Sequence, residues 1–148
     1  MDASSISAQA DRNSYRHFLA IPTRWMDNDV YGHVNNVVYY SFFDTLINDY
    51  LTRVNGHDMA GGAVIHVTAE TMCRYRKSIS FPQVVNAGLR VGRLGTTSVR
   101  YEMSLFVEEE TDAAASGHVI DVFVDRETMR PVEIPATIRG SLARLLVG

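Results

Sequence analysis

The longest apolar segment of the chain lies between residues 35 and 54, where hydrophobic side chains occupy almost every face of a helix. That distribution predicts a buried helix rather than one that lies on the surface. At about 1.5 Å per residue, such a helix would run roughly 30 Å. The pair Asn55-Gly56 follows and supplies a helix stop. We therefore expect this helix to be the centre of the fold.

Strand-like stretches separated by turn signals surround the helix. They cover residues 15–25, 62–80, 84–93, 98–108 and 114–125. The short turns between the later stretches favour an antiparallel meander over parallel crossovers. Residues 138–147 are typical of a short amphipathic helix. One buried helix and about five strands predict an α+β domain, with a sheet wrapped around the helix, over residues 14–148. Residues 1–13 are polar and are predicted to form a loose tail.

The composition restricts the class of protein without identifying it. The chain has 148 residues, enough for one domain, with ordinary hydrophobic and charged contents of 46% and 21%. The net charge of −3 argues against nucleic-acid or membrane-surface binding. The single cysteine, Cys73, cannot form an intrachain disulfide, and residues 1–14 lack the apolar stretch of a signal peptide. We expect a cytoplasmic protein with neither nucleic-acid nor membrane partners.

The segment 27–39 carries the candidate chemistry. Two carboxylates, Asp27 and Asp29, a glycine, a histidine and two asparagines precede the most hydrophobic element. Backbone N–H groups point outward at a helix start, where the helix dipole favours negative charge. The segment therefore offers a carboxylate and backbone donors that could attack a carbonyl and stabilise an oxyanion. On the residues alone, Asp29 could equally satisfy donors in its own loop.

The run Asp27-x-Asp29-x-x-Gly32-His33-x-Asn35-Asn36-x-x-Tyr39 resembles the signature of hotdog-fold acyl-CoA thioesterases, in the 4-hydroxybenzoyl-CoA thioesterase-like branch. Later segments recur in the same order in that family: 81–82, 95–98, 115–125 and 130–135. The resemblance covers the chain from about Tyr15 onward. It implies a hotdog fold and a cofactor-free hydrolase of acyl-CoA, CoA being part of the substrate. It also implies sheets paired into a homodimer, or further into a homotetramer, with active sites at the interface.

The resemblance assigns Asp29 as the catalytic carboxylate, acting as nucleophile or as general base. It assigns the backbone N–H at Asn36 to the thioester oxygen, while the Asn36 side chain could simply cap the helix. His33 could orient Asp29 or make a structural hydrogen bond. Asp27 is expected to be structural, and Gly32 to allow an unusual backbone angle.

Basic residues are candidates for the phosphates of CoA, because arginine forms forked hydrogen bonds with phosphate. Arg74 and Arg76 are expected on one face of a strand with Lys77 opposite, and Arg90 and Arg93 on the next strand. A solvated basic face is the alternative. No zinc-ligand spacing, Walker loop or serine-hydrolase elbow is present, so no metal site is expected.

Other functions remain open at this point. The rivals are an acyl-carrier-protein thioesterase, an acyl-CoA-binding domain without turnover and a hotdog dehydratase, whose motif the segment does not match.

Asp44 is a weaker candidate for a catalytic carboxylate, one that lies on the helix itself, and Cys73 is not expected to be a nucleophile. His66 and Glu70, at even spacing, are expected to share a strand face. The acyl group cannot be deduced from the sequence.

Overall fold

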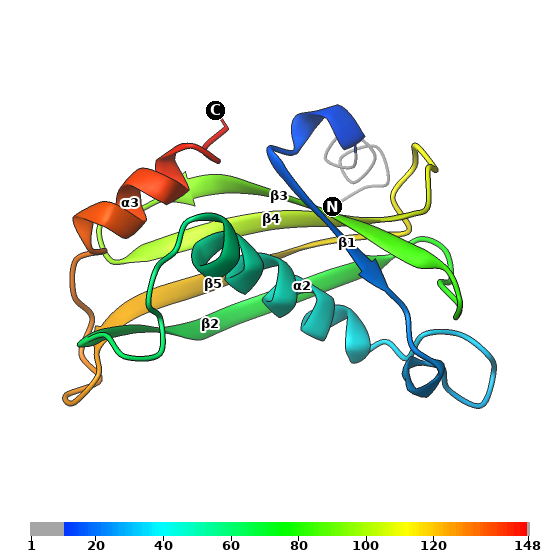
Figure 1. The fold of residues 1–148 in the computed structure, drawn as a ribbon, viewed down its shortest axis with the longest axis horizontal. Helices are drawn as coiled ribbons and strands as arrows, with labels where there is room; N and C mark the ends of the chain where they lie inside the picture. The colour runs from blue at the N-terminus through cyan, green and yellow to red at the C-terminus, as the bar shows by residue number, and fades with distance from the viewer. Residues whose placement is uncertain (1–10, 148) are drawn as a thin grey trace.

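The computed structural model describes residues 11–147 and contains one five-stranded sheet in the order β1-β3-β4-β5-β2, with every neighbouring pair antiparallel. The strands are β1 (His17–Pro22), β2 (Val64–Tyr75), β3 (Val84–Leu94), β4 (Ser98–Val107) and β5 (Ala115–Asp125). The long helix α2 (Val38–Asn48) packs against this sheet (Figure 1). The predicted α+β architecture with about five strands is confirmed.

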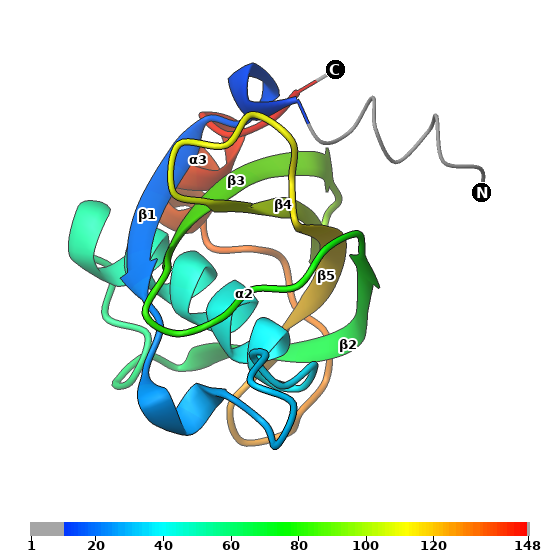
Figure 2. The same ribbon diagram turned by 90° about the vertical axis from the view of Figure 1, so that its right-hand side faces the viewer.

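The strand order differs from the predicted meander. Only β3, β4 and β5 follow one another in both sequence and space, while β1 and β2 lie at opposite edges of the sheet. The helix between β1 and β2 spans the concave face of the sheet, so the two strands that it joins end up far apart (Figure 2). Residues 76–83 then lead the chain from the β2 edge to β3.

Helix α2 is buried on one face rather than on all faces. Its buried residues recur at the spacing of an amphipathic helix; they are Tyr39, Phe42, Phe43, Leu46 and Ile47. The opposite stripe is exposed because it carries the polar side chains of the segment; it contains Tyr40, Ser41, Asp44 and Thr45. The prediction of complete burial is therefore wrong for the single chain. None of the helices in residues 11–147 is long and apolar enough to cross a membrane.

The α-helical part of the predicted helix is shorter than expected. It begins at Val38 and passes at Asp49 into a π-helical segment, η3 (Asp49–Val54). The predicted stop is confirmed, because Gly56 adopts a φ of 70° and its N–H donates to the Thr52 carbonyl over 2.8 Å. The later helix, α3 (Ala136–Ala143), begins two residues before the predicted start and ends before its predicted end.

The N-terminal segment is tied to the sheet from residue 11 onward. A short 3-10 turn, η1 (Arg12–Ser14), places the Arg12 guanidinium 4.8 Å from the centre of the Phe106 ring. Arg12 Nη2 also donates to the Glu108 carbonyl over 3.0 Å. Residues 11–13 are thus not a loose tail, and the rest of the predicted tail lies outside the described residues.

A β-bulge in β2 separates two side chains that were expected to share a face. The register against β5 shifts between Thr68 and Glu70, which leaves Ala69 as the additional residue. His66 Nδ1 lies 3.1 Å from an Asp121 oxygen on the face toward α2. Glu70 Oε2 lies 2.6 Å from His118 Nε2 on the other face. The period-two prediction is therefore wrong, because the additional residue reverses the alternation.

Candidate functional site

The segment before α2 is a loop closed at its base. The N–H of Asn35 donates to the Asp27 carbonyl over 2.8 Å. The Asp27 carboxylate is 1% exposed and accepts from Arg24 N at 2.8 Å and Arg24 Nη2 at 2.7 Å. Burial disfavours the charged carboxylate, but the Arg24 hydrogen bonds outweigh it and hold the pKa of Asp27 below its usual range. Asp27 thus fixes the base of the loop.

Asp29 is held at the tip of this loop by backbone groups. Its Oδ1 accepts from the N–H of Tyr31 over 2.8 Å and from the N–H of His33 over 3.4 Å. Its own N–H donates to the His33 carbonyl over 2.8 Å. Within residues 11–147, Oδ2 has no hydrogen-bond partner. One carboxylate oxygen is therefore anchored and the other is available for chemistry.

Gly32 and His33 complete the tight turn around Asp29. Gly32 has a φ of 81°, and a Cβ there would meet no atom within 4 Å, so glycine is favoured by backbone conformation rather than by crowding. The imidazole of His33 is exposed and makes no hydrogen bond to another residue of the described chain. It is the His33 backbone, not its ring, that contacts Asp29.

The first turn of α2 presents a free backbone donor. Asn35 Oδ1 accepts from Val37 N over 3.3 Å, which gives Asn35 the capping role expected near the helix start. The N–H of Asn36 has no partner among residues 11–147. The carbonyl of the same residue accepts from the Tyr75 hydroxyl over 3.2 Å. A fixed turn and an unused N–H are the elements of an oxyanion site.

Two open hollows lie along the segment that leads into α2. One, of about 280 Å³, is lined by His33, Asn36, Tyr75, Arg76 and Lys77. The second, of about 430 Å³, is lined by Asp29 together with apolar side chains. Those side chains are Trp25, Met26 and Val30, which are 75%, 73% and 93% exposed. The candidate site therefore consists of two hollows, a basic side that Asn36 lines and an exposed apolar side that Asp29 lines.

The predicted CoA-binding residues divide into two groups. Arg76 and Lys77 lie beside Asn36, just beyond the end of β2, so they are loop residues and not strand residues. Arg74 is directed to the outer face of the sheet, beside Ser116 of β5. Arg93 is exposed near the far end of β3. The predicted sharing of a strand face by Arg74 and Arg76 is not observed, because β2 ends at Tyr75.

Other reactive groups lie apart from this chemistry. Burial raises the pKa of the Cys73 thiol to about 11, which keeps it protonated and unreactive at neutral pH. Asp44 is exposed on α2 and accepts from the Asn48 amide over 3.2 Å. The part of the chain that the structure describes contains no group of three or more histidine, cysteine or acidic residues able to hold a metal ion.

The sequence did not point to the residues that position the turn from a distance. Tyr75 reaches the α2 start from the end of β2, and its ring meets Tyr39 edge-on with centres 4.8 Å apart. Asn28 Oδ1 accepts from Phe81 N over 3.1 Å. Both contacts join segments about forty or more residues apart in sequence, so only the folded chain reveals them.

A long helix in the concave face of a five-stranded antiparallel sheet, with the carboxylate loop at its start, defines a hotdog-fold protein. Residues 23–142 match the thioesterase-like superfamily, and the chain belongs to that superfamily.

Solved structures agree with this assignment. The chain is similar to the PA5185 protein of Pseudomonas aeruginosa PAO1, at 49% identity over 94% of this chain and 97% of that one, with a TM-score of 0.91. The PA2801 protein of Pseudomonas aeruginosa is 32% identical over 85% of this chain and 97% of that chain, with a TM-score of 0.79. A DHNA-CoA thioesterase from Staphylococcus aureus is 19% identical over 86% and 88% of the two chains, with a TM-score of 0.77, and shares the fold. None of the curated proteins matches the chain.

Proposed function

We propose that the protein hydrolyses an acyl-CoA thioester to a carboxylic acid and CoA, as in the 4-hydroxybenzoyl-CoA thioesterase-like branch. The observation that carries this proposal is the pairing of a rigid carboxylate with a free oxygen, Asp29 Oδ2, and an unused backbone donor, the Asn36 N–H. Asn36 lies two residues before α2, and Asp29 lies at the tip of the loop that leads to it. Membership of the thioesterase-like superfamily supports the same reaction class.

Two routes use this pair. As a general base, Asp29 takes a proton from water while the water oxygen bonds to the thioester carbon. As a nucleophile, the carboxylate itself bonds to that carbon, and water then hydrolyses the resulting anhydride. In both routes the Asn36 N–H donates to the developing oxyanion, and the C–S bond breaks as the CoA thiolate leaves. A metal or an organic cofactor is not required for either route.

The basic side of the site suits the carrier of the acyl group. Arg76 and Lys77 line the hollow beside Asn36, and they are the residues that we assign to the phosphates of CoA. Lys77 also forms an ion pair with Glu110. Arg76 is therefore the stronger candidate of the two for binding phosphate. Because acyl-carrier proteins are acidic, the same basic side favours an acyl-carrier-protein thioesterase as the second candidate.

The test is thiol release from short, medium, long and aromatic acyl-CoA substrates by the wild type and by Asp29→Asn. We expect the substitution to lower kcat by at least about a hundred-fold, since it removes the base or nucleophile. Asp44→Asn is the matched control, because it removes the same charge from an exposed position on α2. It is expected to change kcat by less than about two-fold.

The outcomes separate the candidates. Equal loss in both variants, or no loss in Asp29→Asn, would overturn the assignment of Asp29. Saturable binding of acyl-CoA without thiol release would indicate a binding domain. Release from an acyl-carrier protein that is far faster than from the same acyl-CoA would favour the second candidate.

The proposed assembly is a homodimer paired through β2, or a homotetramer made of two such dimers. This strand has twelve residues, lies at the sheet edge and exposes its middle residues, 68–71. A long edge strand with unpaired N–H and C=O groups is a template for pairing with another strand. A second copy of the same strand would satisfy those groups and cover the edge.

A further inference from the structure

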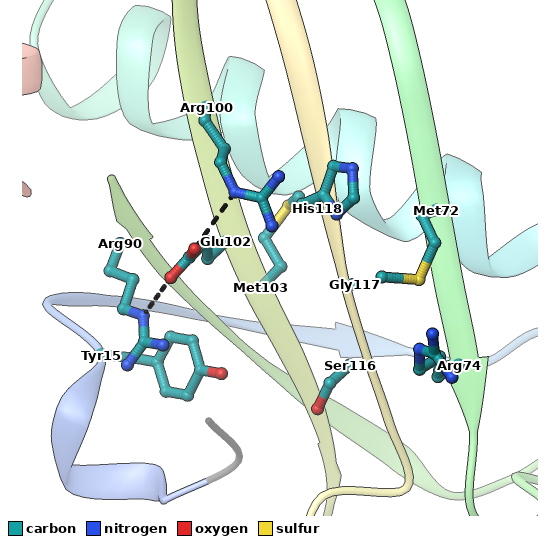
Figure 3. Close-up of a pocket in the computed structure, with 10 residues that line it drawn as sticks. All are labelled: Tyr15, Met72, Arg74, Arg90, Arg100, Glu102, Met103, Ser116, Gly117 and His118. Atoms are coloured by element: carbon teal, nitrogen blue, oxygen red, sulfur yellow. Dashed lines mark hydrogen bonds and ion pairs between the residues drawn. The ribbon is translucent and has the colours of Figure 1, made fainter. Parts of the chain in front are cut away.

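The outer face of the sheet, opposite α2, carries a cluster of polar side chains that the proposed reaction does not use. Figure 3 shows Arg74, Ser116, His118, Arg90 and Arg100 arranged around one hollow, together with Tyr15 and Glu102. The register explains the arrangement, because Arg74 of β2 lies opposite Ser116 of β5, and His118 of β5 lies opposite Glu102 of β4. The hollow has a volume of about 20 Å³, which suits one water-sized particle.

Two buried nitrogens at this hollow lack hydrogen-bond partners. Arg74 Nε is inaccessible to solvent and unpaired, and no carboxylate within residues 11–147 forms an ion pair with Arg74. His118 is 8% exposed, and its Nδ1 is also unpaired while Nε2 contacts Glu70. An unpaired buried polar group is unfavourable, so these two nitrogens favour a bound partner.

The charge around the hollow identifies the kind of partner. Three arginines line it. Glu102, the one carboxylate in the lining, already accepts from Arg90 at 2.9 Å and from Arg100 at 3.2 Å, and Glu70 contacts His118 from outside the lining. Arg74 is left as an uncompensated cation. Arginine nitrogens only donate, and His118 donates through both ring nitrogens when it is charged and paired with Glu70. An acceptor with negative charge therefore completes the cluster.

A hydrogen-bonded chain adds a third donor. The Tyr15 hydroxyl lies 2.5 Å from Ser104 Oγ, and Ser104 Oγ lies 2.7 Å from Ser116 Oγ. Burial raises the pKa of Tyr15, so its phenol stays protonated and can start the chain as a donor. When each hydroxyl donates to the next, the Ser116 hydrogen is free for the hollow, and such chains strengthen their terminal donor.

We propose that this hollow is a halide site, in which chloride bridges Arg74 of β2 to Ser116 and His118 of β5. A single-atom anion matches the volume, the donors and the excess positive charge. A bound chloride joins the edge strand to its neighbour next to Tyr75, which holds the start of α2. The site is independent of the proposed hydrolysis, because it lies on the other face of the sheet.

The test uses bromide as a probe of the intact protein. We expect crystals grown in sodium bromide to show an anomalous peak within about 3.5 Å of Arg74 Nε and His118 Nδ1. A light-atom peak without anomalous signal would be a water and would overturn the proposal, as would an empty site.

A thermal-melting series gives an independent readout. Replacing gluconate by chloride at equal ionic strength is expected to raise the Tm of the wild type by about 3 °C. Arg74→Gln and His118→Gln should each abolish that difference, whereas Arg130→Gln, which removes an exposed arginine elsewhere, should keep it. A chloride effect that persists in Arg74→Gln and His118→Gln would overturn the site.

Discussion

Gly117 shows how one residue sets the distance between two strands and the helix. A Cβ at this position would lie 2.0 Å from the Met72 carbonyl oxygen and 3.0 Å from the Phe43 ring. Neither neighbour can yield easily, because one is backbone of β2 and the other is a fully buried aromatic of α2. Gly117 therefore permits the close packing of β2, β5 and α2.

Gly117→Ala is expected to destabilise the protein by ~2 kcal/mol, the usual cost of overpacking. Gly140→Ala is the matched control, because a Cβ there meets nothing within 4 Å and α3 gains a better helix former. Urea unfolding measures both. Equal effects of the two substitutions would show that crowding at Gly117 is unimportant.

Asp27 gives the stability a predictable pH dependence. Its folded pKa lies below the unfolded value of about 4. The stability that it adds is therefore present above about pH 4 and is lost as the pH falls through the folded pKa. We expect Asp27→Asn to be less stable than the wild type at pH 7, with a difference that shrinks from about pH 5 toward pH 2 in urea unfolding. A difference independent of pH would contradict the ionic role of Asp27.

At the scale of elements, the end of β2 fixes the start of α2. The Tyr75 hydroxyl donates to the Asn36 carbonyl, and burial, together with Cys73 and Tyr40, raises the pKa of Tyr75 and keeps it protonated. Because the same turn carries the free Asn36 N–H, Tyr75 is a positioning residue for the proposed oxyanion site.

Tyr75→Phe keeps the ring contact with Tyr39 and removes only the hydroxyl. The loss of one hydrogen bond of about 1 kcal/mol should lower kcat by roughly five-fold. KM should change little, and the unfolding free energy should fall by no more than about 1 kcal/mol, because the ring still packs. Steady-state kinetics measures kcat and KM, and urea unfolding measures the unfolding free energy. A rise in KM alone would mean that Tyr75 contacts the substrate rather than the turn.

The spacing of hydrophobic residues predicted most helices and strands, because the apolar side chains of each element lie on the face that is buried. It located β3, β4 and β5 within one or two residues, together with the helix and its stop at Gly56. It failed where distant segments decide the outcome. The bulge at Ala69, the π-helical end of α2 and the edge position of β2 depend on neighbours in space. For the candidate site, the sequence indicated Asp29 and Asn36, whose catalytic roles stay predictions, but not Tyr75.

At the scale of the whole molecule, the exposed edge of β2 governs the proposed assembly. Ala69 lies in the exposed middle of that strand and adds no charge to it. A lysine on an edge strand opposes pairing with a second strand.

We therefore expect Ala69→Lys to convert the oligomer to a monomer, measured by light scattering after size exclusion. Ala136→Lys, at an exposed position at the start of α3, is the control and should leave the mass unchanged. A wild type that is itself monomeric would contradict the proposed dimer. If the site needs a second copy, thiol release should fall together with the mass.

The bulge at Ala69 also has a consequence for symmetry. In a regular strand, even-numbered and odd-numbered residues point to opposite faces. When such a strand pairs with its own copy about a two-fold axis, even residues lie opposite even ones and odd opposite odd, and the central residue lies opposite itself. In β2 the faces exchange at Ala69, so His66 and Cys73 point to the same side of the sheet. If residues that point to one face are to lie opposite residues that point to the same face, the two-fold axis must pass between two residues. Thr68 then lies opposite position 71 of the other copy. Cysteines at positions 68 and 71 would cross-link only to each other, so a mixture of the two single variants would yield disulfide-linked heterodimers, and neither variant alone would.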